Sequence, residues 1–170
     1  MHLRKNRKSP QKDRIYTQKK LQSLATVSFL TSINENLNKE MAFKVASDAF
    51  GKFMTTYYRN ILSDFEPGSQ ERFNRFRESY VQFASETPYC EIIESASTIL
   101  KVKFTRCPFY EILTDEGLAD LAYAYCISDQ TFTENVLPGV QFSRNHEIVT
   151  GSAYCDHIWE FSSPKQRKQT

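Results

Sequence analysis

The spacing of apolar residues changes near Pro88, and this change constrains the fold more than any other feature of the chain. Up to Pro88, apolar residues recur every three or four positions, which predicts amphipathic helices over three runs: residues 21–37, 38–63 and 73–83. Beyond it, residues 91–104 and 154–161 have the composition and alternation of strands. Helices followed by mostly antiparallel strands predict an α+β domain, with N-terminal helices packed on a C-terminal sheet.

Smaller signals divide the second half of the chain. Residues 91–104 form either two strands or one long bent strand, and short helices are predicted between the strands, at residues 108–114, 117–125 and 129–135. Pro138 and Gly139 open another extended run, whose one face carries Val140, Phe142 and Arg144. In the last strand, Asp156 lies on one face, and the opposite face carries Cys155, His157, Trp159 and Phe161.

Length and charge predict a single domain between two basic ends. The chain has 170 residues, the size of one domain with one core. Nine of its 22 basic residues and one of its 20 acidic residues fall in residues 1–14 and 164–170, which leaves 13 basic and 19 acidic residues between them. We expect disordered basic tails around one acidic domain, residues 15–163, and no nucleic-acid partner.

The apolar run at residues 24–30 is too short to cross a bilayer, and no small-residue cleavage site of a signal peptide follows it. We therefore expect a cytoplasmic protein without a membrane partner. In that compartment its four cysteines would remain free thiols.

The motifs of common metal and cofactor sites do not occur. There is no Cys-x2-Cys pair, no His-x3–5-His, no glycine-rich phosphate loop and no Gly-x-Ser-x-Gly. A metal site assembled in space from Cys155, His157 and either Cys107 or Cys126 is not demanded by the spacing. We expect neither a metal nor an organic cofactor.

Cys107 lies between a predicted strand and a predicted helix. Pro108 fits the first helical position, so Cys107 is expected at the helix N-terminus, where unpaired N–H groups and the helix dipole favour a thiolate. Tyr110 and Glu111 follow three and four residues later and fall near the same helical face. The alternative is that Cys107 is a small buried apolar residue.

Three polar residues accompany the later cysteines. Asp129 follows Cys126 by three residues, and Asp156 is next to Cys155, although a regular strand would turn those two to opposite faces. Arg144 shares a strand face with apolar residues. It either pairs with a structural carboxylate or binds an anionic ligand.

Three segments of the C-terminal third read CPFYEILTDEGLADLAYAYCISDQ (107–130), LPGVQFSR (137–144) and GSAYCDHIWEF (151–161). Together they resemble the L-2-amino-thiazoline-4-carboxylic acid hydrolase family. The pattern is Cys-Pro-x-Tyr, a glycine, Cys-x-x-Asp, a Pro-Gly strand and Gly-x-x-x-Cys-Asp. The chain differs from it at His157, where the family usually has an aromatic residue, and in the segment before Gly151.

The resemblance implies hydrolytic opening of a cyclic isothiourea to a carbamoyl derivative of cysteine. The substrate would be a small molecule with a carboxylate, bound by Arg144 with Cys126 and Cys155 nearby. Cys107 is the preferred nucleophile and Tyr110 a donor. Alternatively, one of three carboxylates acts as general base on water: Glu111, Asp129 or Asp156.

Two other functions fit the same residues. One is a small-molecule-binding or redox-sensing domain without catalysis, in which the cysteines are core or sensor residues and Arg144 binds a ligand's acid group. The other is an interaction protein that binds partners through its basic ends. A fast-reacting thiol would argue against a purely packed role for the cysteines.

Overall fold

The computed structural model describes residues 10–162, so residues 1–9 and 164–170 of the expected tails, and residue 163 of the expected domain, lie outside it. Within that range the chain forms six α-helices: α1 (Pro10–Gln22), α2 (Leu24–Asn36), α3 (Lys39–Ile61), α4 (Gln70–Ser85), α5 (Pro108–Asp115) and α6 (Ala119–Val136). It also forms four strands and a short 3-10 helix: β1 (Cys90–Ala96), β2 (Ile99–Phe104), β3 (Val140–Ser143), η1 (Ile148–Thr150) and β4 (Cys155–Phe161). The predicted α+β class is confirmed.

The strands form one antiparallel sheet in the order β1-β2-β4-β3. Residues 91–104 are therefore part of a hairpin of two strands rather than one bent strand. In the central pair, Phe104 is opposite Cys155 and Val102 is opposite His157. This register places the end of β2, which leads into Cys107, next to the start of β4.

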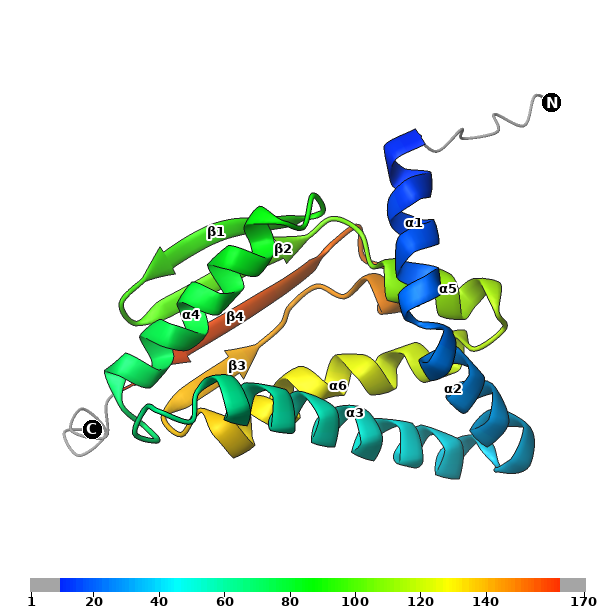
Figure 1. Ribbon diagram of the computed structural model, residues 1–170, viewed down its shortest axis with the longest axis horizontal. Helices are drawn as coiled ribbons and strands as arrows, with labels where there is room; N and C mark the ends of the chain where they lie inside the picture. Colours follow the sequence, from blue (N-terminus) through cyan, green and yellow to red (C-terminus); the bar gives the residue numbers. More distant parts are fainter. Residues whose placement is uncertain (1–9, 163–170) are drawn as a thin grey trace.

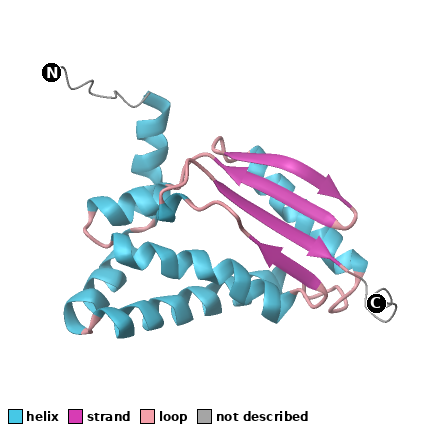
Figure 2. Cartoon of the chain, turned by 180° about the vertical axis from the view of Figure 1, so that it is seen from behind, coloured by secondary structure: helices cyan, strands magenta, loops and turns pink. Residues whose placement is uncertain are grey.

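The helices gather on the sheet in two groups (Figure 1). Helix α4 crosses one face of the sheet, and α3 and α6 run side by side below it and contact each other extensively. Helices α1, α2 and α5 lie at the end of the sheet where β2 ends and β4 begins. Figure 2 shows the opposite face of the sheet, with no helix drawn across it within the described residues.

Two apolar clusters form the core. The larger one joins α4, the C-terminal halves of α3 and α6, and the sheet, around Phe76, Phe132 and Trp159. Trp159 is fully buried, and its indole Nε1 donates a hydrogen bond to Thr133 Oγ1 at 3.0 Å. The smaller cluster joins the first halves of α3 and α6 with α2 and α5, around Leu30 and Leu113.

Local signals explain several helix ends. Ser69 Oγ accepts a hydrogen bond from the N–H of Arg72, which confirms it as the N-cap of α4, and Asn38 caps α3 in the same way. Pro108 begins α5, as expected from its missing N–H.

Three predicted boundaries were wrong. The regions predicted as a short helix at 117–125 and a helical turn at 129–135 belong to one long helix, α6. The first apolar run is divided at Ser23 between α1 and α2, and α1 already begins at Pro10, so residues 10–14 are helical rather than part of a tail. Among the described residues, no helix is long and apolar enough to cross a membrane.

Candidate functional site

A cleft of about 660 Å³ lies where the two core clusters meet. Its walls come from α1, α2, α3, α4, α5, α6, β2 and β4, so elements from both halves of the chain build it. The polar residues of its lining are mainly on the C-terminal elements, and the apolar residues are mainly on α2, α3 and α4. We call these two parts the polar end and the apolar arm.

Three thiols line the polar end: those of Cys107, Cys126 and Cys155. Cys107 is the N-cap of α5, Cys126 lies on the inner side of α6, and Cys155 begins β4. Each is free, as the sequence predicted. The three cysteines are 19 and 29 positions apart in the sequence, yet all line one cleft. The pairing of β4 with β2 brings Cys155 near the end of β2, which leads to Cys107.

The sequence predicted that Cys107 would favour the thiolate form, but the structure favours the neutral thiol. Its position at a helix start is confirmed, and the N–H groups of Phe109 and Tyr110 do lower its pKa. Burial outweighs them and raises the pKa of Cys107 to about 11. Burial likewise raises the pKa of Cys126 to about 12 and that of Cys155. All three are neutral thiols at pH 7, so Cys107 needs a proton acceptor to become a nucleophile.

Asp129 and Arg144 form a buried ion pair beside the thiols. Arg144 donates from a terminal nitrogen to Asp129 Oδ2 at 2.6 Å, and from its other terminal nitrogen to Glu147 Oε1 at 3.2 Å. The Arg144 side chain is only 6% exposed. Arg144 therefore pairs with carboxylates, as one of its two expected roles requires, but its Nε has no hydrogen-bond partner among residues 10–162.

Burial raises the pKa of Asp129 to about 7, although Arg144 opposes the shift. A carboxyl group with a pKa near neutrality exchanges a proton readily at pH 7, which suits a general acid or base. Asp129 is the one predicted carboxylate that lines the cleft.

A scan against protein-family models matches the description "L-2-amino-thiazoline-4-carboxylic acid hydrolase" over residues 18–159, which is most of the chain. The chain belongs to this family. The match extends the resemblance, which rested on the C-terminal third, through α2, α3 and α4.

Two further comparisons add little about activity. A solved structure of trafficking protein particle complex subunit 3 from Naegleria fowleri, covalently bound to palmitic acid, is similar with a TM-score of 0.50 and 13% identity. The similarity covers 86% of this chain and 96% of that one, and at this identity it concerns the fold alone. The comparison with curated proteins gave no match.

In this member of the hydrolase family, three of the predicted site residues lie outside the cleft lining. Tyr110 packs against the smaller core cluster, and Glu111 forms a paired ion bridge with Arg106 at 2.6 Å. Asp156 faces away from Cys155, as strand alternation requires, and accepts hydrogen bonds from the N–H groups of Asn145 and His146. Of these three, Glu111 keeps a link to the cleft, because Arg106 lines it.

Arg106 and His157 line the cleft without having been predicted as site residues. The alternation of β4 had placed His157 on the same strand face as Cys155, and this was the one sequence signal that His157 would lie near the site. Its Nδ1 lies 3.6 Å from Asp129 Oδ2, beyond hydrogen-bond length, and has no hydrogen-bond partner among residues 10–162. No group of three or more potential metal ligands with suitable geometry occurs among the described residues.

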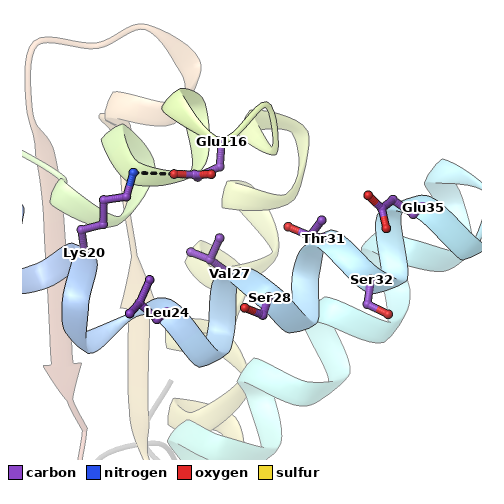
Figure 3. Close-up of a pocket in the computed structure, with 8 residues that line it drawn as sticks. All are labelled: Lys20, Leu24, Val27, Ser28, Thr31, Ser32, Glu35 and Glu116. Carbon is purple, nitrogen blue, oxygen red and sulfur yellow. Dashed lines mark hydrogen bonds and ion pairs between the residues drawn. The ribbon is translucent and has the colours of Figure 1, made fainter.

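A second hollow, of about 400 Å³, lies along α2 (Figure 3). It contains an ion pair between Lys20 and Glu116 and the hydroxyl groups of Ser28, Thr31 and Ser32. None of the predicted site residues lines it, so the family's chemistry is better sought in the larger cleft.

His157 predicts a pH dependence of stability. Burial and the neighbouring Arg144 lower the pKa of His157 well below 6.5 in the folded chain. Below pH 6.5 the unfolded chain binds a proton that the folded chain does not, so acidification favours unfolding. We expect the free energy of unfolding to fall between pH 7 and 5 more steeply in the natural chain than in His157→Phe, by up to about 1.4 kcal/mol per pH unit.

Urea unfolding of both proteins at several pH values measures this difference. Asp129 titrates in the same range with the opposite sign, and because it is present in both proteins, most of its contribution cancels in the comparison. Parallel pH profiles would show that His157 is not held neutral by the fold.

Proposed function

We propose that the cleft hydrolyses a small cyclic isothiourea of the 2-amino-thiazoline-4-carboxylate type and opens its ring to a carbamoyl-cysteine derivative. Family membership supports the reaction class. The observation that carries the proposal is the meeting of three thiols with the buried Asp129–Arg144 pair at one end of the cleft. A nucleophile, a proton-exchanging carboxyl and a cation are the groups that this ring opening needs.

In the proposed mechanism, Cys107 Sγ attacks the ring carbon between nitrogen and sulfur. The thiol proton moves to the ring nitrogen of the substrate, because the raised pKa of Cys107 leaves no standing thiolate. The bond from this carbon to the ring sulfur then breaks, and the departing sulfur takes up a proton from a nitrogen of the isothiouronium that forms. The product of this step is an open isothiourea attached to Cys107.

Water completes the reaction. It gives a proton to Asp129, which passes it to an isothiourea nitrogen, and its oxygen adds to the same carbon. The bond to Cys107 then breaks, and the proton of the added hydroxyl restores the thiol. The water oxygen becomes the carbonyl oxygen of the carbamoyl product. Asp129 suits this role because its pKa of about 7 allows it to take up and release a proton near neutral pH.

The remaining residues of the polar end have supporting roles in this proposal. Arg144 Nε, buried and without a partner among residues 10–162, would donate to the substrate carboxylate. Glu111 would act indirectly by fixing Arg106, and Tyr110 and Asp156 would position α5 and the turn before β4. The test for these positioning roles is a change in KM, with kcat retained, in Tyr110→Phe and Asp156→Asn.

The direct test is incubation of the purified protein with L-2-amino-thiazoline-4-carboxylate, with and without a chelator. We expect carbamoyl-cysteine and a new free thiol, detected by mass spectrometry and thiol titration, in equal amounts and unaffected by chelation. Binding of the compound without product would contradict hydrolysis and favour small-molecule binding without catalysis.

A further inference from the structure

The cleft is larger than a small ring substrate requires. Its volume of about 660 Å³ falls among sites that hold drug-sized ligands, roughly 300–1,000 Å³. A single thiazoline ring with an amino group and a carboxylate would occupy the polar end and leave the apolar arm empty. An unfilled apolar arm of this size indicates that a further part of the ligand belongs there.

The lining of the arm indicates the chemistry of that part. Side chains from four elements form it: Phe29, Phe50, Phe53, Met54, Phe83 and Phe104. Each is aromatic or a thioether, and none offers a charge or a strong hydrogen bond. The arm therefore fits an alkyl or aryl group rather than a polar one.

Three of these phenylalanines are exposed although they line the same cleft. Phe29 is 45% exposed, Phe53 62% and Phe83 42%, and they come from α2, α3 and α4 respectively. Single exposed apolar residues are ordinary on protein surfaces, but these three line one cleft from three helices and form its apolar mouth, although the same lining also includes the polar Lys19 and Gln22 of α1.

The polar end supplies the second observation. Arg144 Nε and His157 Nδ1 are both buried there without a hydrogen-bond partner among residues 10–162. Buried polar groups normally have partners, so these atoms indicate a ligand's polar head at the inner end. The head would lie at Arg144 and the apolar group would extend outward to the mouth.

We propose that the natural substrate is amphipathic: a cyclic isothiourea head with its carboxylate toward Arg144 and an extended alkyl or aryl substituent on the exocyclic nitrogen. This nitrogen lies across the ring from the carboxylate, so its substituent is directed toward the apolar arm. The inference rests on the proposed function and names the substrate class of the same site.

The test compares L-2-amino-thiazoline-4-carboxylate with its 2-octylamino derivative, by kcat/KM for ring opening and by calorimetric Kd. Burial of a methylene group strengthens binding about threefold to fourfold, so we expect the octylamino compound to gain about a hundredfold or more, even if only half of its chain is buried. An octylamino compound that is neither bound nor converted better than the parent would overturn the proposal.

Two variants and one control locate the gain in affinity. Ala49 lines the arm on α3, and Ala49→Trp should reduce the advantage of the octylamino compound over the parent at least tenfold. Lys52→Trp, on the same helix but exposed and outside the lining, should leave the advantage unchanged. Phe53→Ser, at the exposed mouth, gives a second reading if Ala49→Trp does not fold. If the octylamino compound kept its advantage in both Ala49→Trp and Phe53→Ser, the proposed position of its alkyl group in the apolar arm would be overturned.

Calorimetry separates this inference from the proposed function. If neither compound is hydrolysed, but the octylamino compound binds at least tenfold more tightly and Ala49→Trp removes the difference, the hydrolase proposal fails and the amphipathic ligand stands. If the parent alone is hydrolysed efficiently, the hydrolase proposal stands and the extended substrate is excluded.

Discussion

Cys107→Ser should lower kcat for ring opening on the order of 10³-fold or more, because the hydroxyl is a far weaker nucleophile than sulfur. Cys107 lines the cleft from the N-cap of α5, where two backbone N–H groups approach its sulfur. Those N–H groups stabilise negative charge that develops on sulfur during attack, even though the resting thiol is neutral. The measurement is steady-state turnover with the thiazoline substrate.

The other thiols of the cleft are the matched controls. Cys126→Ser and Cys155→Ser alter the same cleft but leave the proposed nucleophile, so their kcat should fall by less than about tenfold. Cys90 is buried in the larger core cluster, outside the cleft, and Cys90→Ser should leave kcat unchanged in whatever fraction folds. If Cys107→Ser retained turnover within tenfold of the natural chain, the attack would have to come from water activated by Asp129.

Arg72→Met should lower the free energy of unfolding by about 3 kcal/mol, the largest stability effect that we expect from a single polar residue. Arg72 is buried on α4 and donates to the carbonyl groups of Val136 and Leu62 at 2.8 Å and of Phe65 at 2.6 Å. It thus joins the C-terminal ends of α3 and α6. Methionine fills a similar space but leaves the carbonyls of Val136 and Phe65 without this donor, at about 1–3 kcal/mol for each buried group, whereas the carbonyl of Leu62 still accepts from the N–H of Phe65.

Urea unfolding followed by circular dichroism measures the loss, with an unchanged m-value as the check for a two-state transition. Arg75 provides the control on the same helix, because it is half exposed and its closest carboxylate, on Glu78, lies 3.8 Å away. We expect Arg75→Met to change stability by less than about 0.5 kcal/mol. Equal effects at the two positions would show that the three carbonyl contacts of Arg72 do not contribute as described.

The sequence predicted elements where local chemistry decides them. Ser69 as a cap, Pro108 at a helix start and the alternation of β4 all act within a few residues, and each was found in place. The continuity of α6 was missed because Asp129 and Thr133 occupy its buried face and interrupt the apolar pattern. Those two polar residues are satisfied by Arg144 and Trp159, which are distant in sequence, so the local pattern could not identify them as core.

The candidate site was predictable to a similar extent. The family pattern pointed to Cys107, Cys126, Asp129 and Cys155, and the strand face shared with Val140 and Phe142 pointed to Arg144; all five line the cleft. The apolar arm could not be predicted, since its phenylalanines read as ordinary helix stripes until α2, α3 and α4 are brought together. Glu111 forms an ion pair with Arg106, and helical spacing alone did not predict that pair.

The most direct test of the account is a rapid-quench experiment with L-2-amino-thiazoline-4-carboxylate, followed by intact-mass and peptide analysis. The account predicts a transient adduct with the full mass of the substrate, because ring opening on sulfur loses no atoms, and it predicts that the adduct maps to Cys107. The adduct should persist in Cys126→Ser and be absent in Cys107→Ser. Product formation at the natural rate with no adduct on Cys107 at any quench time would contradict the account.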